Sequence, residues 1–254
     1  MPSMRKLKIG LIGEGANDVG IADGCGGWRF GTMPDYIEQL LGSEFNSEFD
    51  LEFIPIDIRK EEMKALTITR TGKYSKIQFK GPAKKLMYFL MRYQKQHVDF
   101  DVLVFFSDTD KTQGKKASET EAKNQYEERR SYIDEGFVVI KKRFNLHCIL
   151  MMPIRILECW LLGDAEGFEG IGCSPQKPKL PKKPEFLWGD VHNPESNYPK
   201  HYLKRILKNC GFEESNTEVF KDIVRHNNIE NLLKNCPNSF ERFYQDIEEL
   251  KNAL

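Results

Sequence analysis

The chain has 254 residues, of which 40% are hydrophobic and 30% charged, so it is long and apolar enough to bury a core of its own. That composition excludes a disordered or fibrous protein. The 38 basic and 38 acidic side chains cancel. A net positive charge therefore cannot draw the molecule to nucleic acid or to an anionic membrane, and any such contact needs a local patch.

Four short apolar runs predict buried parallel strands, at residues 7–13, 51–55, 102–107 and 148–152. Helix signals lie between them. The first predicted helix has Thr32 as N-cap and ends at Gly42, and the second begins near Pro82. The third begins at Ser118, with Glu121 as capping-box partner, and stops near Gly136. This alternation predicts an α/β fold with a parallel sheet of about four strands, helices on both faces, and ligands at the carboxyl ends of the strands.

The last third of the chain changes character. Six of the twelve prolines fall between residues 174 and 199, which predicts a loop or extended arm. Beyond it the apolar spacing is helical again, which predicts a small C-terminal helical subdomain packed on the sheet. We therefore expect an α/β catalytic domain over residues 1–170, a proline- and lysine-rich arm over 171–199, and the helical subdomain over 200–254.

The sequence also indicates a compartment. No run approaches the ~20 apolar residues that cross a bilayer, and residues 1–8 carry no signal-peptide pattern. The cysteines are far apart and form no CxxC pair, so we expect mostly reduced core thiols rather than a disulfide framework or a zinc site. We expect a cytoplasmic protein with no membrane contact. The six cysteines are Cys25, Cys148, Cys159, Cys173, Cys210 and Cys236.

Acidic residues follow the predicted strands. Glu14 follows the first strand, and Asp108 and Asp110 follow the third. Because the carboxyl ends of parallel strands share one edge, these three carboxylates are expected to converge, and such hard-oxygen clusters suit Mg²⁺ or Mn²⁺. The alternative is that each acid only caps a helix or solvates a loop. Glycines flank Glu14, but the segment fits neither the Walker A pattern nor GxGxxG, which weakens any nucleotide-cofactor interpretation.

These motifs resemble the Toprim domain of topoisomerases, primases and the overcoming-lysogenisation-defect nucleases, in which a strand ends in Glu-Gly and a later strand in Asp-x-Asp. The resemblance implies that Glu14 is the general acid or base and that Asp108 and Asp110 bind Mg²⁺. Glu-Gly-Ala-Asn-Asp-Val is similar to the Glu-Gly-x-x-Asp-Val of several Toprim nucleases, which implies that Asp18 is a further ligand or a helix cap.

Segment 153–164, PIRILECWLLGD, and Ser239-Phe-Glu-Arg-Phe resemble a poorly characterised prokaryotic family of Toprim-like proteins. Its members often lie near mobile-element and phage-defence functions, and the resemblance covers nearly the whole chain. We expect one helix to carry Arg155 and Glu158 on the same surface. Glu158 is then a metal carboxylate and Arg155 a phosphate contact, or the two form a helix ion pair, while Asp164 ends that helix.

Basic residues form local patches. Residues 63–98 contain no acid but nine positive charges, with Tyr74, Phe79 and Tyr88 among them, as phosphate-backbone binding requires. A solvated lysine-rich face is the alternative. The five histidines show no ligand spacing and are expected to be structural or on the surface. The predicted substrate contacts are Lys84, Lys85, Lys111, Lys115 and Arg155.

The first functional hypothesis is a Mg²⁺-dependent Toprim-like nuclease that hydrolyses nucleic acid, in phage defence or a mobile element. The second is a non-catalytic Toprim-like subunit that binds nucleic acid or a partner protein of a defence complex. The third is a phosphatase, because Asp108-Thr-Asp110-Lys-Thr112 fits the DxDxT of haloacid dehalogenases. In that family the motif normally opens the domain, whereas here a strand-helix-strand-helix segment precedes it.

Overall fold

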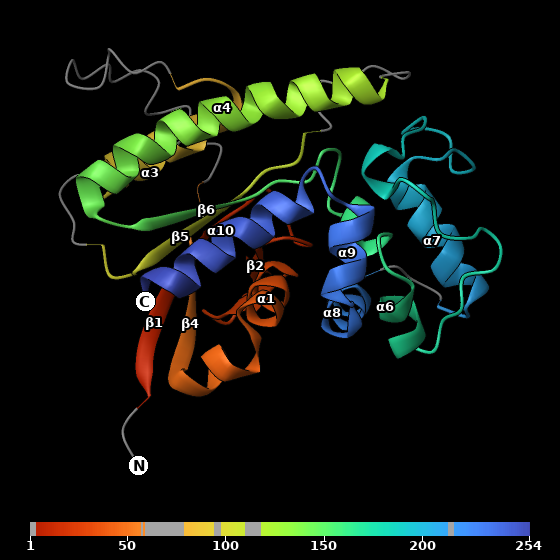
Figure 1. The fold of residues 1–254 in the computed structure, drawn as a ribbon, viewed down its shortest axis with the longest axis horizontal. Helices are drawn as coiled ribbons and strands as arrows, with labels where there is room; N and C mark the ends of the chain where they lie inside the picture. Colours follow the sequence, from red (N-terminus) through yellow and green to blue (C-terminus); the bar gives the residue numbers. More distant parts are fainter. Residues whose placement is uncertain (1–3, 57, 59–78, 94–97, 110–117, 213–215) are drawn as a thin grey trace.

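The computed structural model describes residues 4–56, 58, 79–93, 98–109, 118–212 and 216–254. Its centre is a four-stranded parallel sheet in the order β4-β1-β5-β6 (Figure 1). The predicted strands are confirmed. They are β1 (Arg5–Ile12), β4 (Phe49–Pro55), β5 (Val102–Phe106) and β6 (His147–Met151).

The strand order contains a switch point. From β1 the chain passes to β4, which lies on one side of β1, and then crosses to β5, which lies on the other side of β1. The connections therefore leave β1 and β5 in opposite directions, which opens a crevice between the carboxyl ends of these two strands. Ligands of open α/β sheets bind in such a crevice.

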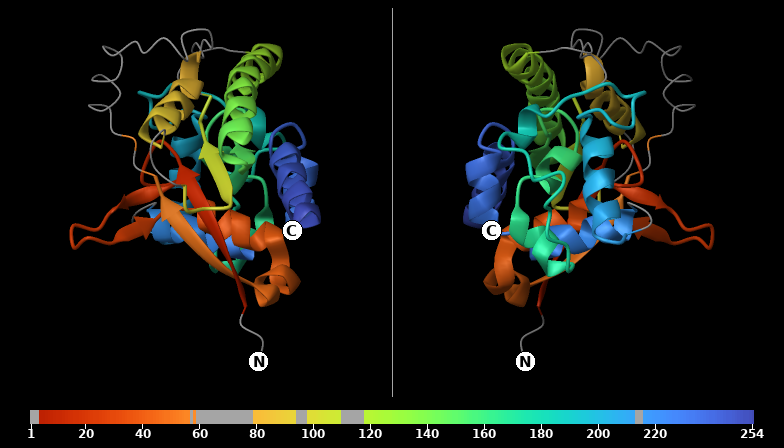
Figure 2. Two further views of the ribbon diagram at one scale, coloured as in Figure 1. Left: turned by 90° about the vertical axis from the view of Figure 1, so that its left-hand side faces the viewer. Right: turned by 90° about the vertical axis from the view of Figure 1, so that its right-hand side faces the viewer.

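The sheet is buried on both faces. In β5, Val102, Val104 and Phe106 belong to one hydrophobic cluster, while Leu103 and Phe105 belong to the other. This alternation follows from the two-residue period of a strand. Helices α1 (Met33–Glu48) and α10 (Phe240–Ala253) belong to the first cluster, and α3 (Lys84–Arg92) and α4 (Glu119–Phe144) to the second, as the two sides of the sheet in Figure 2 show.

Helix α1 begins as its sequence predicts, with Thr32 at the N-cap and Pro34 in the first turn. Gly42 does not end the helical segment, however. It interrupts the helix with φ 82° and ψ 166°, and helical turns resume up to Glu48. Positive φ is open to glycine because it lacks a Cβ atom. The glycine therefore makes a kink where a terminus was predicted.

Helix α4 begins with the predicted capping box. The Ser118 hydroxyl accepts from the Glu121 N–H at 3.2 Å, and the Glu121 carboxylate accepts from the Ser118 N–H at 2.7 Å. The predicted end near Gly136 is wrong, because the helix continues to Phe144 and ends at Asn145, which has the left-handed φ of 54°. Gly136 is instead a packing position inside the helix.

The C-terminal part contains α5 (Glu158–Leu161), α6 (Ala165–Gly170), α7 (Pro199–Asn209), α8 (Thr217–His226), α9 (Ile229–Asn235) and α10. Residues 174–198 form the predicted loop, with a short 3₁₀ turn at Pro184–Phe186. The rings of Tyr36, Trp160, Phe240 and Phe243 contact one another, so this part shares a core with α1. None of the described helices is long and apolar enough to cross a bilayer.

The cysteines depart in part from expectation. Cys148, Cys159 and Cys236 are buried free thiols, as expected, but Cys25 is exposed. A disulfide joins Cys173 and Cys210, contrary to the prediction of reduced thiols. The two cysteines are 37 residues apart in the sequence, and no local pattern links them. Burial raises the pKa of Cys148 to about 12, so this thiol stays protonated and unreactive at neutral pH.

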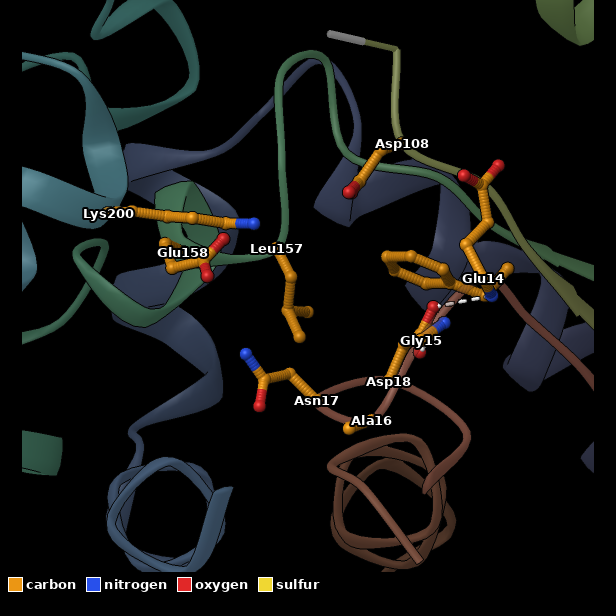
Figure 3. Close-up of a pocket in the computed structure, with 10 residues that line it drawn as sticks. Glu14, Gly15, Ala16, Asn17, Asp18, Asp108, Leu157, Glu158 and Lys200 are labelled. Atoms are coloured by element: carbon orange, nitrogen blue, oxygen red, sulfur yellow. Dashed lines mark hydrogen bonds between the residues drawn. The ribbon is translucent and has the colours of Figure 1, made fainter. Parts of the chain in front are cut away.

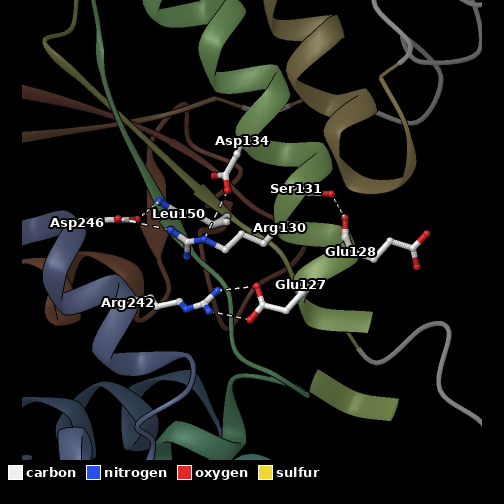
Figure 4. Close-up of polar contacts among 8 residues, drawn as sticks. All are labelled: Glu127, Glu128, Arg130, Ser131, Asp134, Leu150, Arg242 and Asp246. Atoms are coloured by element: carbon white, nitrogen blue, oxygen red, sulfur yellow. Dashed lines mark hydrogen bonds and ion pairs between the residues drawn. The ribbon is translucent and has the colours of Figure 1, made fainter. Parts of the chain in front are cut away.

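Helix α10 lies along the edge strand β6 and is tied to it by Asp246 (Figure 4). The Asp246 carboxylate accepts from the Leu150 N–H at 3.2 Å and lies 3.6 Å from the Arg130 guanidinium of α4. Arg242, one turn earlier in α10, pairs with Glu127 of α4 at 2.7 Å. The edge of the sheet is therefore covered and one of its N–H groups satisfied.

A two-stranded antiparallel ribbon interrupts the passage from β1 to α1. It consists of β2 (Gly20–Ala22) and β3 (Trp28–Phe30). No strand is predicted in this segment, although Asp23-Gly24 is a turn signal between two short apolar stretches. We call residues 20–30 the hairpin arm, and Figure 2 shows it projecting from the body of the molecule.

Candidate functional site

A cavity of about 240 Å³ lies at the switch point, where β1 and β5 end. Both strands contribute a carboxylate to it, and the opposite wall comes from the C-terminal part of the chain (Figure 3). We call it the switch-point cavity. Its lining residues are Glu14, Gly15, Ala16, Asn17, Asp18, Phe106, Asp108, Leu157, Glu158 and Lys200.

The loop that carries Glu14 is wound around the side chain of Asp18. One carboxylate oxygen of Asp18 accepts from the Glu14 N–H at 2.8 Å, and the other accepts from the N–H groups of Gly15 at 2.7 Å and Val19 at 2.8 Å. Burial raises the pKa of Asp18, and these N–H donors oppose the rise because they favour the charged form. Asp18 therefore shapes the loop, and both of its oxygens are occupied.

Neighbouring elements hold the outside of the same loop. The carbonyl of Asn17 accepts from the N–H and the hydroxyl of Thr32, both at 2.9 Å, and the Asn17 side chain accepts from the Thr217 hydroxyl at 2.8 Å. The Lys85 ammonium donates to the Gly13 carbonyl at 2.7 Å. Lys85, predicted as a substrate contact, thus supports the backbone one residue before Glu14.

The end of β5 is joined to the same loop. The Ser107 hydroxyl donates to Oε1 of Glu14 at 3.2 Å, so it links the two strands that flank the switch point. Asp108 follows and is half-buried, with its carbonyl accepting from Arg129 of α4 at 2.6 Å. These contacts fix the backbone on which Glu14 and Asp108 stand. Asp110, Lys111 and Lys115 lie outside the described residues.

The opposite wall carries Glu158, Leu157 and Lys200. Glu158 is the first residue of α5 and is only 2% exposed, whereas Lys200 lies in the first turn of α7 and is exposed. In Figure 3 the Lys200 side chain extends from α7 toward Glu158, across the cavity from Glu14 and Asp108. The cavity therefore has carboxylates on both walls, and its cation, Lys200, lies on the helix side beside Glu158.

The donor set suits a hard divalent cation, because four of the lining residues are carboxylates, namely Glu14, Asp18, Asp108 and Glu158. Within the described parts of the chain, however, no three Asp, Glu, His or Cys side chains come close enough together to enclose an ion. Mg²⁺ commonly takes only one or two protein carboxylates and completes its shell with water and substrate phosphate oxygens. Glu14 and Asp108 fit that role. Glu158 is a further acid on the opposite wall, and both carboxylate oxygens of Asp18 already accept from backbone N–H groups.

A scan of protein families matches residues 34–248 to a domain of unknown function, DUF4276. The chain belongs to this family. The match spans Asp108, Glu158 and Lys200 of the switch-point cavity and begins after Glu14 and the hairpin arm. No curated protein and no solved structure matches the chain.

Besides Lys85, three predicted site residues of this DUF4276 chain lie outside the cavity lining. Arg155 is not helical, because α5 begins only at Glu158. It is 1% exposed, its guanidinium lies 4.8 Å from the centre of the Trp188 ring, and burial lowers its pKa. Asp164 caps α6 through the Gly167 N–H at 3.1 Å and does not end the preceding helix. Lys84 is exposed at the start of α3.

Sequence reasoning missed two lining residues, Asn17 and Lys200. Asn17 lies inside the Glu-Gly-Ala-Asn-Asp motif, so its place beside Glu14 was available from the sequence. Lys200 follows Pro199, whose place before an apolar period is a helix-start signal. That signal predicts where α7 begins. It does not predict that the first turn of α7 lies against the cavity, because this depends on tertiary packing.

Proposed function

We propose that this protein is a metal-dependent phosphodiesterase that hydrolyses nucleic acid, with Mg²⁺ or Mn²⁺ as its cofactor. One observation carries the proposal: Glu14 and Asp108, from the ends of two neighbouring parallel strands, face one cavity at the switch point, and Glu158 faces them. The arrangement agrees with the Toprim-like pattern of the sequence.

The residues of the cavity divide into roles. Asp108 and Glu14 would hold the cation, and a cation bound there supplies Lewis-acid polarisation of a phosphate. Glu14 is also the group that takes or gives a proton, with its backbone fixed by Asp18 and its carboxylate oriented by the Ser107 hydroxyl. Lys200 on the far wall contacts a phosphate oxygen, and Glu158 orients that lysine or the cation.

The proposed partner is the phosphate backbone of nucleic acid, which such groups contact without reading sequence. Lys200 is an exposed cation of the cavity lining, and Lys84 is an exposed cation next to Lys85, which contacts the loop that carries Glu14. The basic segment 63–98 lies mainly outside the described residues. A role in phage defence or a mobile element, within a complex that includes a partner protein, remains part of the same proposal.

A second candidate is a non-catalytic subunit that binds nucleic acid. Such a subunit needs only exposed cations that contact phosphate, such as Lys84 and Lys200, and no metal ion. The haloacid dehalogenase hypothesis is weaker, because its mechanism assigns no role to Glu14, yet that residue lines the same cavity as Asp108.

Cleavage of labelled single- and double-stranded DNA and RNA, with Mg²⁺, Mn²⁺ or EDTA, tests the proposal. We expect metal-dependent cutting by the wild type and at least a hundredfold loss in Asp108→Ala and in Glu14→Ala, since a positioned acid-base group contributes about 10²–10⁴-fold. Glu249→Ala is the matched control, since Glu249 is an exposed acid in α10 and does not line the cavity.

Each outcome assigns one function. Full cutting by either cavity variant contradicts the phosphodiesterase proposal. Binding of nucleic acid without metal-dependent turnover supports the non-catalytic subunit. Turnover of phosphate monoesters that is lost in Asp108→Ala and retained in Glu14→Ala supports the phosphatase. Thermal unfolding of each variant shows whether a loss of activity reflects loss of the fold.

A further inference from the structure

The hairpin arm has two different faces. Ile21 and Arg29 are directly opposed in the antiparallel pairing, so their side chains share one face of the ribbon. Trp28 and Phe30 belong to the other face and pack against the main hydrophobic cluster. One face therefore attaches the arm to the body, and the other presents Ile21 and Arg29 outward.

The base of the arm is fixed to the loop that carries Glu14. Gly20 donates its N–H to the Gly15 carbonyl at 3.2 Å, and the Trp28 indole donates to the Val19 carbonyl at 3.0 Å. Gly20 has φ 107°, and a Cβ atom there would lie 2.0 Å from the Arg29 carbonyl oxygen. The close approach of the two strands thus needs this glycine, and the arm and the Glu14 loop form one unit.

The tip of the arm is shaped by its own residues. Oδ1 of Asp23 accepts from the N–H groups of Cys25 at 2.8 Å and Gly27 at 2.9 Å, as in an Asx turn. Gly24 and Gly26 adopt positive φ, and a Cβ atom on either would meet nothing within 4 Å. The tip is thus an ordered turn surrounded by open space.

The outward face combines an apolar side chain with a cation. Ile21 is 48% exposed, and Arg29 is exposed with no ion pair or hydrogen bond of its guanidinium recorded among the described residues. Arginine and isoleucine together are the groups with which β-ribbons and minor-groove proteins contact a nucleic-acid backbone and the sugars and base edges beside it. An acidic partner matches the charge of this face.

We propose that the hairpin arm binds the nucleic-acid substrate beside the cut, with Arg29 on a backbone phosphate and Ile21 against the adjoining sugar and base edge. This inference rests on the proposed function and names a surface of the same site. Ile21 follows Asp18, which lines the cavity, by three positions in the sequence, and three residue steps span at most about 11 Å. At 3.4 Å per nucleotide along a duplex, the arm contacts the strand within about three nucleotides of the cavity.

Fluorescence-anisotropy titrations of labelled single- and double-stranded oligonucleotides, in EDTA and at several salt concentrations, measure this contact without catalysis. We expect Arg29→Ala to weaken binding about fivefold to tenfold and to reduce the slope of log K against log salt by about one, as the loss of one phosphate contact does. Ile21→Asp is expected to weaken binding further, because it places a carboxylate against the backbone.

Lys142→Ala is the matched control. It removes the same charge from an exposed position in the last turn of α4, at the opposite edge of the sheet. Wild-type affinity and slope in Arg29→Ala, or an equal loss in Lys142→Ala, would overturn the arm proposal. So would a wild-type protein that binds no oligonucleotide.

Hydrolysis of bis(p-nitrophenyl) phosphate separates this inference from the proposed function. The small diester does not reach the arm, so we expect Arg29→Ala to hydrolyse it at the wild-type rate while cutting oligonucleotides more slowly. Arg29-dependent binding without any diester hydrolysis would contradict the phosphodiesterase and leave the arm in place. Diester hydrolysis without Arg29-dependent binding would contradict the arm alone.

Discussion

Asp18 shows how one side chain prepares the site. A carboxylate that resembles a metal ligand in sequence accepts three backbone N–H groups and gives the loop its turn, which places the neighbouring Glu14 at the cavity. The same turn requires a glycine at position 13, since a Cβ atom there would lie 2.3 Å from the Val19 side chain. Asp18 thus acts by shaping the loop, and Glu14 and Asp108 are the groups to which we assign chemistry in the proposed function.

Lys200 carries the prediction at this scale. A charge-assisted hydrogen bond contributes about 1.5–3 kcal/mol, so Lys200→Met is expected to raise the KM for nucleic-acid cleavage about tenfold or more. Lys204→Met is the control, since Lys204 is exposed on the same helix one turn further on. Steady-state kinetics of both variants measure this effect. An unchanged KM in Lys200→Met would contradict a contact between Lys200 and the substrate phosphate.

Among the elements, α4 depends on a glycine in its interior. A Cβ atom at Gly136 would lie 2.8 Å from Cδ1 of Leu86 and 3.2 Å from the Phe79 ring. The glycine therefore allows α3 and the segment before it to approach α4 closely. In an isolated helix glycine is unfavourable by about 1 kcal/mol relative to alanine, so only the packing explains its presence.

A larger side chain at this position tests that packing. We expect Gly136→Leu to lower the free energy of unfolding, because overpacking costs about 1–3 kcal/mol and the better helix propensity of leucine offsets part of it. Val138→Leu, at a position of the same helix that is 66% exposed, should stay within about 0.5 kcal/mol of the wild type. Urea unfolding measures both, and equal stabilities would contradict the close approach.

The elements also show what the sequence can predict. All four strands of the main sheet, the capping box at Ser118 and the helical periods of the last third are local patterns, and the structure confirms them. Gly42 and Gly136 both match the local pattern of a helix end, and a local rule cannot distinguish a terminator from a kink or a packing contact. The hairpin arm was missed because its strands have three residues each, too few for a period.

The site, like the fold, was predictable only where a local pattern specifies it. Strand ends gave Glu14 and Asp108, since parallel strands share an edge. The assignment of Arg155 as a phosphate contact relied on a helix that begins three residues later, and its side chain is buried beside Trp188. Lys200 depends on how α7 lies against the sheet, which no local pattern specifies.

In the whole molecule, Glu185 connects the proline-rich loop to the last helix. Its carboxylate is 1% exposed and accepts from the N–H groups of Asn238 at 3.1 Å and Ser239 at 2.7 Å, just before α10. The Ser239 hydroxyl in turn accepts from the Trp160 indole at 2.8 Å. The loop, α5 and α10 are thereby joined through one buried acid.

Glu185→Gln tests this connection. The amide nitrogen cannot accept a hydrogen bond, so a buried donor loses its partner at a cost of about 1–3 kcal/mol in the free energy of unfolding. Glu195→Gln, at an exposed position in the same loop, is the control and should be neutral. A Glu185→Gln protein as stable as this control in urea would show that the loop docks without the carboxylate.

The ring cluster of Tyr36, Trp160, Phe240 and Phe243 also constrains synthesis in the cell. Tyr36 leaves the ribosome early, but its aromatic neighbours in α10 emerge about 200 residues later, since they lie at positions 240 and 243. At about 5–20 residues per second, that interval lasts on the order of 10–40 s. Throughout that interval the face of the sheet that α1 and α10 share lacks α10, so this chain is expected to engage chaperones on the ribosome before it folds.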